Sequence, residues 1–484
     1  MAEHADNEFV EQRKSNMAAL AGKGRSPFGG AFKRTGRLAE VRAEFVEEKP
    51  VALAGRITTW RDMGKSIFAD LRDGSDRFQI YAQKNTLGDE AFEAFKLLDL
   101  GDHVGVEGAL FTTRTGEPTL KITHWSMLAK ALLPLPEKWH GLKDTDQRYR
   151  QRYLDLIANP GVRDVFNKRI QIVREIRNRL CARQFQEVET PMMQPQPGGA
   201  TARPFSTHYE ALDCRMYLRI APELYLKRLL VGGFDKVFEL NRNFRNEGLS
   251  RTHNPEFTMM EVYEAYSDMR GMKELVEELI TEVARAVMGT LQVGSPDAPI
   301  DLTRPWREVA YRDLVRERMG PEWFALDAPA MRLRAEAMSL YVDPAWGTDE
   351  ITQEVYSKLI EKTLQNPTFV TRLPAELVPL AKRCEDDPSV VDVFELVIGG
   401  KEIAPGYSEL NDPLEQRRRF EAQAGEEAQK VDEDFLAALE HGMPPAGGMG
   451  IGIDRLVMTL TGSEAIRDVI LFPQLKPRED AVPP

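Results

Sequence analysis

Residues 236–266 alternate apolar and polar positions on either side of a polar loop. The first arm, residues 237–243, mixes Val, Phe and Leu with polar partners, as a half-buried strand does. The loop, residues 246–255, collects Asn, Gly, Ser, His and Pro, which form turns. The second arm repeats with period two, so four of its side chains share one face: Phe257, Met259, Glu261 and Tyr263. This pattern predicts a hairpin, and the alternative is a surface hairpin laced with ion pairs.

A series of short alternating segments covers residues 51–127 and predicts five strands. Gly and Asp turns separate the strands, and one short helix is expected near residues 90–98. Five strands and a helix suit an OB-type barrel, which binds single-stranded nucleic acid on an aromatic face. Trp60, Phe68 and Tyr81 are candidate stacking groups, although aromatic residues of a small barrel usually belong to its core.

Helical spacing appears at residues 162–183, where one apolar stripe is expected at Phe166, Ile170, Val173, Ile176 and Leu180. A strand should follow at residues 185–191 and end at Pro191. Residues 270–345 read mostly as amphipathic helices. The Pro- and Gly-containing residues 131–144 predict a linker between two domains.

A second hairpin is predicted around Gly399 and Gly400, which form a two-residue turn between apolar strands. That turn pairs position 398 with 401 and 397 with 402, which places Glu395 diagonally across from Glu402. Diagonal neighbours lie roughly 7 Å apart, so both acids can reach one hard cation. The alternative is two solvated carboxylates. Pro405 and Gly406 should then bulge the strand, with Tyr407 and Glu409 beyond them on one face.

The Gly-rich residues 447–463 end a strand and begin a helix, with glycines at alternate positions. Asp454 is a candidate helix cap. Arg455 falls in the first turn, where its charge opposes the helix dipole unless an anion lies beside it. In the same way Glu223 follows Pro222 at a strand-to-helix step, where the dipole favours an acid.

Composition restricts the class of protein. The chain has 484 residues, 42% hydrophobic and 29% charged, which is typical of a globular protein with more than one domain. Its three scattered cysteines argue against a disulfide framework or a zinc site. We expect no membrane span and no secretory signal, because the sequence lacks a run of about 18 apolar residues and its N-terminus is charged.

The formal charge of −12 argues against a generic nucleic-acid coat protein, so RNA binding would require a local basic patch. Residues 12–37 contain basic side chains and no acid. They indicate either a solvated surface or an RNA-backbone contact. The basic residues are Arg13, Lys14, Lys23, Arg25, Lys33, Arg34 and Arg37.

Several strings resemble the class II aminoacyl-tRNA synthetases, and specifically the bacterial-type lysyl-tRNA synthetases. FRNEG followed by THNPEFTMMEVY is similar to motif 2 of that class, and the helix and strand of residues 162–191 are similar to motif 1. Residues 447–463 resemble motif 3, and residues 214–233 match the lysyl family closely. The resemblance implies an α+β protein, with an N-terminal OB-fold barrel followed by an antiparallel catalytic sheet flanked by helices.

The resemblance also implies a domain plan. Residues 1–50 would be a helical and basic extension, 51–130 the anticodon-binding barrel, 131–150 the linker and 151–484 the catalytic domain. A helical insertion is expected at about residues 270–345. The flexible loop at residues 196–205 would use Gly198 and Gly199 for close approach to a ligand.

Functional roles follow from the same resemblance. Arg245 and Arg455 would be the catalytic residues. ATP would be held by Arg245, Glu247, His253, Asn254, Phe257, Glu395 and Arg455. Lysine would be held by Gly199, Glu223, Arg245, Glu261, Tyr263, Tyr407 and Glu409. Mg²⁺ would be bound by Glu395 and Glu402, and the anticodon by Arg61, Phe68, Gln79 and Glu117.

These roles describe a ligase that joins L-lysine to tRNA(Lys) with ATP as co-substrate, acting in the cytoplasm as a homodimer. Acids beside a phenol suit an ammonium group, whereas an aspartate pocket would need additional cations. The alternatives are a paralogue that modifies another acceptor and a non-catalytic RNA-binding relative. One departure concerns Pro405, where the family usually has a substrate-contacting Asn, and Tyr407 replaces the usual Phe. We expect this departure to affect lysine affinity rather than the fold.

Overall fold

The computed structural model describes residues 5–136, 142–200, 202–424 and 431–477. The chain forms two compact units, Met1–Lys143 and Asp144–Pro484, and the division falls inside the segment predicted as a linker. Within the described ranges, no helix is long and apolar enough to cross a membrane.

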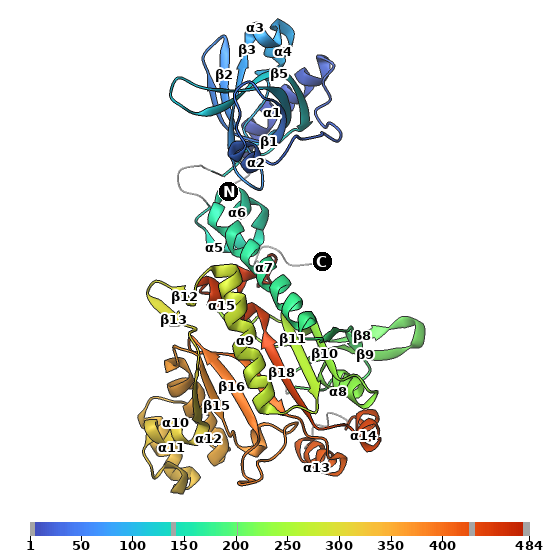
Figure 1. The fold of residues 1–484 in the computed structure, drawn as a ribbon, viewed down its shortest axis with the longest axis vertical. Helices are drawn as coiled ribbons and strands as arrows, with labels where there is room; N and C mark the ends of the chain where they lie inside the picture. The colour runs from blue at the N-terminus through green and yellow to red at the C-terminus, as the bar shows by residue number, and fades with distance from the viewer. Residues whose placement is uncertain (1–4, 137–141, 201, 425–430, 478–484) are drawn as a thin grey trace. The chain divides into compact units, whose positions relative to one another are not determined.

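The first unit is a closed five-stranded barrel with strand order β1-β2-β3-β5-β4 (Figure 1). The five strands predicted from alternation are confirmed, and the predicted short helix is α4. The strands are β1 Pro50–Asp62, β2 Ser66–Arg72, β3 Arg77–Gln83, β4 His103–Thr112 and β5 Pro118–Ala129. The helices are α1 Ala5–Gly22, α2 Leu38–Ala43, α3 Lys84–Leu87 and α4 Asp89–Phe95.

Trp60 packs into the barrel core rather than joining the aromatic face. Its ring stacks on Phe95 at a centroid distance of 5.4 Å. Phe68 and its neighbour Arg61 are cross-strand partners on the other face of the sheet, because side chains alternate along a strand. Trp60 is partly buried against the barrel core, so the structure favours the core alternative for this residue.

Part of the basic N-terminal segment is used inside the first unit. Arg13 is buried and donates hydrogen bonds to the carbonyl oxygens of Leu100 and Ala131, at 3.0 and 2.8 Å. The Arg25 guanidinium lies over the Trp125 ring, 4.3 Å from its centroid. Both arginines therefore stabilise the barrel, and Arg13 is too buried to contact an RNA backbone.

The second unit is built on an eight-stranded sheet with strand order β14-β15-β16-β17-β18-β11-β10-β6. Its neighbouring strands are antiparallel except for β14–β15 and β10–β6, which are parallel. These strands are β6 Gln186–Glu187, β10 Lys236–Phe244, β11 Glu256–Ala265, β14 Arg307–Ala310, β15 Thr368–Thr371, β16 Val393–Ile398, β17 Lys401–Ser408 and β18 Ala446–Gly452. The remaining strands form two separate small sheets, β7-β9-β8 and β12-β13. They are β7 Met193–Gln194, β8 Ser206–Tyr209, β9 Cys214–Leu218, β12 Gln292–Ser295 and β13 Ala298–Asp301.

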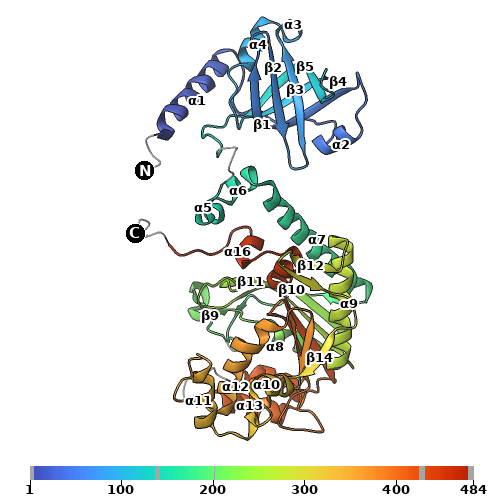
Figure 2. The same cartoon turned by 90° about the vertical axis from the view of Figure 1, so that its left-hand side faces the viewer.

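Helices cover both faces of this sheet. The α-helices of the unit are α5 Thr145–Arg150, α6 Arg152–Ala158, α7 Pro160–Ala182, α8 Glu223–Val231, α9 Met269–Met288, α10 Tyr311–Met319, α11 Ala328–Ala337, α12 Thr348–Val355, α13 Pro413–Ala424, α14 Glu433–Glu440, α15 Ile453–Thr461 and α16 Ile466–Val469. Helices α7, α9 and α15 share one core with alternate sheet residues such as Met260, Val262 and Met449. Figures 1 and 2 show α7 and α9 on the same side of the sheet and α8 on the other.

The period-two pattern of β11 is confirmed, since Met260 and Val262 face the helices while Glu261 and Tyr263 face away. The predicted stripe on α7 is only partly right. Phe166, Ile176 and Leu180 are buried, but Ile170 lies at the edge of the stripe and is 61% exposed. Ile172 is buried in the core instead, because it lies on the same face of α7 as Ile176 and Leu180.

Two further expectations are corrected by the structure. The strand expected at residues 185–191 is only Gln186–Glu187, paired with β10. Residues 270–345 contain the helices expected, but β12, β13 and β14 interrupt them. Helix α9 packs on the main sheet, whereas α10, α11 and α12 pack around a separate core that includes Tyr311 and Trp323.

Candidate active site

A cavity of about 400 Å³ lies on the face of the sheet away from α7 and α9. Strands β11, β16, β17 and β18 form its floor, and the first residues of α8 and α15 reach into it. The central strands are adjacent in the order β17-β18-β11, so residues far apart in the sequence meet there. Most of the residues predicted to bind ATP or lysine line this cavity.

One end of the cavity is acidic. Glu223 begins α8, Glu261 and Tyr263 lie on β11, and Glu409 follows β17. All four are nearly buried, and the Tyr263 hydroxyl donates a 2.9 Å hydrogen bond to Glu261. Burial raises the pKa of Glu261 well above its usual value, and the nearby Glu223 charge raises it further. A buried acid in this state favours a cationic ligand, because an ammonium group stabilises its ionised form.

Strand β18 makes room for this acidic end with glycines. Gly448 pairs with both Tyr263 and Tyr407, and Gly450 pairs with Glu261. A Cβ at position 448 would lie 1.9 Å from Glu409 Oε1 and 2.6 Å from the Tyr263 ring. No larger residue fits there, so these glycines shape the pocket. The sequence prediction omitted them as site residues, although their spacing of two was visible.

A second group of cavity-lining residues is cationic. The Arg245 guanidinium carbon lies 5.2 Å from the centroid of the Phe257 ring, and Arg245 Nε is buried without a hydrogen-bond partner among the described residues. Arg455 and His253 are joined by a 3.1 Å hydrogen bond through His253 Nε2. Burial and the Arg455 charge lower the pKa of His253, so the ring is neutral near pH 7 and accepts from Arg455.

The remaining predicted ligands of this region are placed as follows. Glu247 lines the cavity just beyond Arg245. Asn254 is buried, and its amide nitrogen donates to the Glu256 carbonyl, which leaves its oxygen without a partner among the described residues. Gly199 has φ of 83°, and a Cβ there would lie 3.1 Å from that of Glu223. The loop therefore closes over the acidic end, although residue 201 lies outside the described residues.

The hairpin predicted around Gly399 is confirmed as β16 and β17, with Ile398 opposite Lys401 and Val397 opposite Glu402. The bulge is misplaced in the prediction. It falls at Ile403, between the Val397–Glu402 and Leu396–Ala404 pairs, and not at Pro405. Pro405 continues the ladder opposite Glu395, because the extra residue has already been absorbed. Pro405 and Tyr407 both line the cavity.

Glu395 and Glu402 line the cavity together. Burial raises the pKa of Glu395 well above its usual value, and the charges of Glu402 and Glu361 add to this effect. Glu361 is a third acid that the sequence analysis did not single out; its Oε1 accepts a 3.0 Å hydrogen bond from the Glu402 amide. Over the described part of the chain, no cluster of three or more His, Cys, Asp or Glu has the geometry to hold a metal ion.

The first turn of α15 differs from the prediction in one respect. Gly452, not Asp454, is the N-cap residue. The Asp454 carboxylate instead accepts a 2.8 Å hydrogen bond from the Thr258 amide and pairs with Arg169 at 2.5 Å. Asp454 therefore ties α15 to β11 and α7. Arg455 falls in the first turn as predicted and donates to the Glu402 carbonyl at 3.0 Å.

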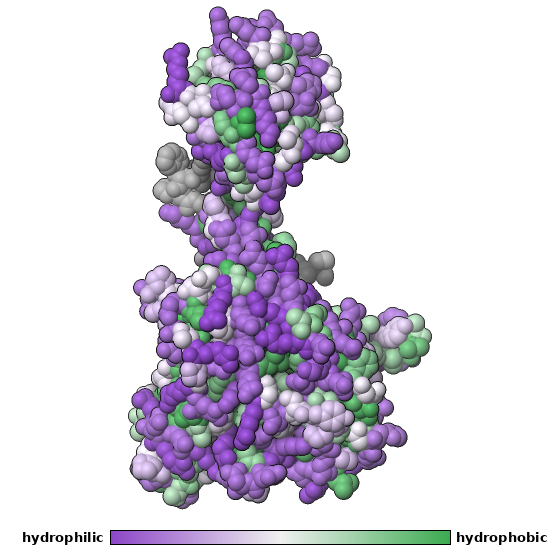
Figure 3. Space-filling view, in the orientation of Figure 1, coloured by the Kyte–Doolittle hydropathy of each residue, from purple (hydrophilic) through white to green (hydrophobic). Residues whose placement is uncertain are grey.

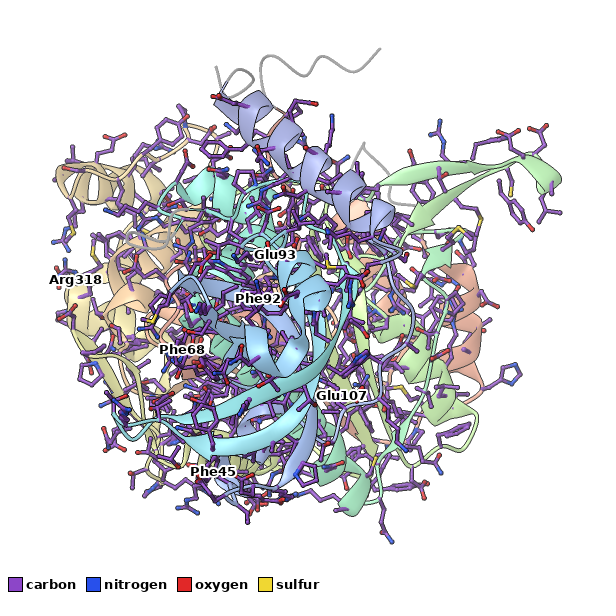
Figure 4. The ribbon with its side chains drawn as sticks, turned by 90° about the horizontal axis from the view of Figure 1, so that it is seen from above. Phe45, Phe68, Phe92, Glu93, Glu107 and Arg318 are labelled. Carbon is purple, nitrogen blue, oxygen red and sulfur yellow. The ribbon has the colours of Figure 1, made fainter. Side chains whose placement is uncertain are left out.

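The candidate anticodon residues lie in the first unit. Phe68, labelled in Figure 4, packs against the Tyr81 ring at 4.6 Å, and the Arg61 guanidinium lies 6.0 Å from the Phe68 ring centroid. Gln79 is buried and accepts a 2.9 Å hydrogen bond from the Thr119 hydroxyl. Glu117 pairs with Arg77 at 3.5 Å. Arg61, Phe68 and Tyr81 form one aromatic and cationic face, while Gln79 and Glu117 already have protein partners.

An antiparallel sheet whose central hairpin carries an arginine and an aromatic over a cavity defines the class II aminoacyl-tRNA synthetase architecture. Residues 144–476 match the family model described as "tRNA synthetases class II (D, K and N)", and residues 51–128 match the model of an OB-fold nucleic acid binding domain. The chain therefore belongs to the class II tRNA synthetases, and it is a ligase with an N-terminal nucleic-acid-binding barrel.

Curated relatives narrow this assignment. The chain is 51% identical to the lysine–tRNA ligase of Pelotomaculum thermopropionicum, over 98% of this chain and 96% of that protein. It is 50% identical to the lysine–tRNA ligase of Carboxydothermus hydrogenoformans, over 99% and 100% of the two chains. It is 48% identical to that of Xanthomonas campestris pv. campestris, over 98% and 97%.

Proposed function

We propose that the protein is a lysine–tRNA ligase. It activates L-lysine with ATP to lysyl-adenylate and transfers the lysyl group to the 3′ end of tRNA(Lys). The observation that carries this proposal is the acidic end of the cavity, where Glu223 and Glu261 line the wall, the Tyr263 hydroxyl donates to Glu261, and the fully buried Glu409 lies near them. Buried carboxylates beside a phenol recognise an ammonium group, and a substrate carboxylate such as that of aspartate would be repelled there.

The reaction requires positioning more than a protein nucleophile. A lysine carboxylate oxygen attacks the α-phosphorus of ATP, the bond to the β-phosphate oxygen breaks, and pyrophosphate leaves. Arg245 holds the α-phosphate and the lysine carboxylate, and its unpartnered Nε supports this role. Phe257 stacks on adenine, and Glu247 and Asn254 assist. His253 and Arg455 address the outer phosphates. These groups neutralise developing charge in a preorganised site.

Both ammonium groups of lysine bind at the acidic end of the cavity, and its carboxylate lies at Arg245. Gly199 and Glu223 receive the α-amino group. Glu261, Tyr263, Tyr407 and Glu409 enclose the side chain. In the second step the terminal ribose hydroxyl of the tRNA attacks the lysyl carbonyl carbon, and AMP leaves with the electron pair of the mixed anhydride.

Glu395 and Glu402 fit a Mg²⁺ site. The evidence is the chemistry of the donors: Glu395 is partly buried near two other acids, and its pKa is raised first by burial and then by the charges of Glu402 and Glu361, all of which a bound cation would offset. Mg²⁺ commonly uses one or two carboxylates together with substrate phosphates, so a two-acid site is sufficient. When bound, the ion would supply charge neutralisation at the phosphates.

In the barrel, Arg61 and Phe68 contact the anticodon of tRNA(Lys), with Gln79 and Glu117 beside them. Support comes from the rings of Phe68 and Tyr81, which give the bases a surface for stacking. The protein acts in the cytoplasm as a homodimer. Apolar side chains exposed on the second unit support the dimer, including Ile170 on α7 and Leu212 between β8 and β9. Figure 3 shows green patches on the hairpin that projects from this unit.

The test is ATP–pyrophosphate exchange with the purified protein and each amino acid in turn. We expect exchange with lysine and none with aspartate or asparagine. Equal exchange with either of those would contradict the proposal. Charging of tRNA(Lys) with labelled lysine then distinguishes a lysine–tRNA ligase from a paralogue that modifies another acceptor.

A further inference from the structure

A buried lysine stands behind the acidic end of the cavity. Lys227 lies on α8, one turn after Glu223, and its side chain is fully buried. Its ammonium group donates to Glu223 Oε1 at 2.7 Å and forms an ion pair with Glu409 Oε2. Glu223 lines the cavity, whereas Lys227 and Glu409 do not, so Lys227 acts on the substrate only through its carboxylate partners.

The charges of this cluster determine what it can bind. Burial opposes the charged form of Lys227, but Glu223 and Glu409 together raise its pKa, so it remains an ammonium group at neutral pH. When all three carboxylates are ionised, as a cationic ligand favours, they and the one resident ammonium leave two negative charges. Glu239, the further acid next to Glu261, is already paired with Arg219 at 2.6 Å. A diamino acid such as lysine brings two ammonium groups, which balance the remaining two charges.

We propose that Lys227 is a positioning residue that acts as a resident counter-ion for Glu223 and Glu409. It fixes the orientation of both carboxylates, and it lowers the charge of the pocket to the value that matches a substrate with two ammonium groups. Without Lys227, three buried carboxylates would face two cations, and the excess acid would take up a proton and turn away from the substrate. This inference rests on the proposed lysine–tRNA ligase activity.

The same arrangement occurs in the first unit and provides a matched control. Lys130 is buried in the barrel and pairs with Asp99 and with Asp102, the latter at 2.7 Å. Lys130→Met removes a buried lysine between two acids, as Lys227→Met does, but no residue assigned to substrate contacts it. A comparison of the two variants separates loss of a buried ion pair from loss of a pocket counter-ion.

The experiment measures pyrophosphate exchange for Lys227→Met, Lys227→Gln, Lys227→Arg and Lys130→Met. For the two neutral Lys227 variants we expect the KM for lysine to rise about tenfold or more. The reason is that the loss of a charge-assisted contact in a buried site lowers affinity by more than about tenfold. The KM for ATP should stay within about twofold of the parent value. Lys227→Arg keeps the charge and should recover part of the lysine affinity, and Lys130→Met should leave both constants unchanged.

A folded Lys227→Met or Lys227→Gln variant with an unchanged KM for lysine would overturn the inference. If neither neutral variant folds, Lys227→Arg decides: lysine-dependent exchange supports the counter-ion role, and its absence in a folded protein overturns it. A parent protein without lysine-dependent exchange would instead refute the proposed function, so the two failures are distinguishable. Circular dichroism and thermal unfolding establish which variants are folded.

Discussion

Replacing Gly448 by Ala should strongly weaken lysine recognition while the protein still folds. The added Cβ would lie 1.9 Å from Glu409 Oε1, whereas Cβ atoms in proteins essentially never come within 3.0 Å of another group. Glu409 must therefore move by about 1 Å, and a misplacement of that size in an active site costs on the order of 100-fold. The same Cβ would press on the Tyr263 ring at 2.6 Å, and that ring is buried and cannot move away freely.

This displacement corresponds to about 2.7 kcal/mol of lost transition-state stabilisation. We expect kcat/KM for lysine to fall about 100-fold in pyrophosphate exchange, with the KM for ATP near its parent value because the ATP end of the cavity is untouched. Overpacking a core costs about 1–3 kcal/mol of stability, so the melting temperature should fall by several degrees without loss of folding.

The control is Gly161→Ala in the first turn of α7. A Cβ at position 161 has no atom within 4 Å, so exchange should be unchanged and stability slightly increased. If Gly448→Ala retains the parent KM for lysine, Glu409 does not contact the substrate where we place it, and the assignment of the acidic end is refuted.

Four further outcomes are expected. Arg245→Ala should remove about 3 kcal/mol or more of transition-state stabilisation, so that a folded variant exchanges pyrophosphate far more slowly. A rate near that of the parent would contradict the role of Arg245. Phe68→Ala should cost about 1–3 kcal/mol of tRNA binding and so weaken charging, while pyrophosphate exchange stays intact. Loss of exchange as well would show that Phe68 has a structural role. Pro405→Asn should lower the KM for lysine by up to about tenfold through one added hydrogen bond, and weaker lysine binding would contradict this. The KM for lysine should fall as the pH rises through about 7, because burial raises the pKa of Glu409 to about 7 and the substrate binds its ionised form; a flat profile would exclude this coupling.

Local patterns were sufficient for the elements that carry the site. The hairpin of β10 and β11 was predicted because period-two alternation and turn residues specify both arms within 30 residues or so of sequence. The turn at Gly399 and Gly400 fixed the register of Val397 opposite Glu402 for the same reason. Resemblance to the synthetase family then brought Arg245, Glu261 and Arg455 into one site, and they line one cavity.

The errors arise where a residue's role depends on its neighbours in space. Asp454 could cap a helix, but its carboxylate pairs with Arg169 and accepts a hydrogen bond from the Thr258 amide. Proline is common at bulges, but the register of the β16–β17 ladder shifts two residues before Pro405, at Ile403. Trp60 has the chemistry of a stacking platform, yet Phe95 packs against it in the core. In each case the side chain suits two environments, and only the fold selects one.

The omission of Gly448 has a different cause. Along β18 the glycines alternate with Met449 and Ile451, which pack against the helices. Alternation of this kind indicates that one face of the strand must be free of side chains, but it does not say what needs the space. The answer lies on the two neighbouring strands, where Tyr407 and Tyr263 flank Gly448 from either side. A pocket for a long side chain on the face of a sheet needs a residue without a side chain at its centre and large side chains on the neighbouring strands. Glycine at every second residue of a central strand therefore marks the floor of a binding pocket once the order of the strands is known.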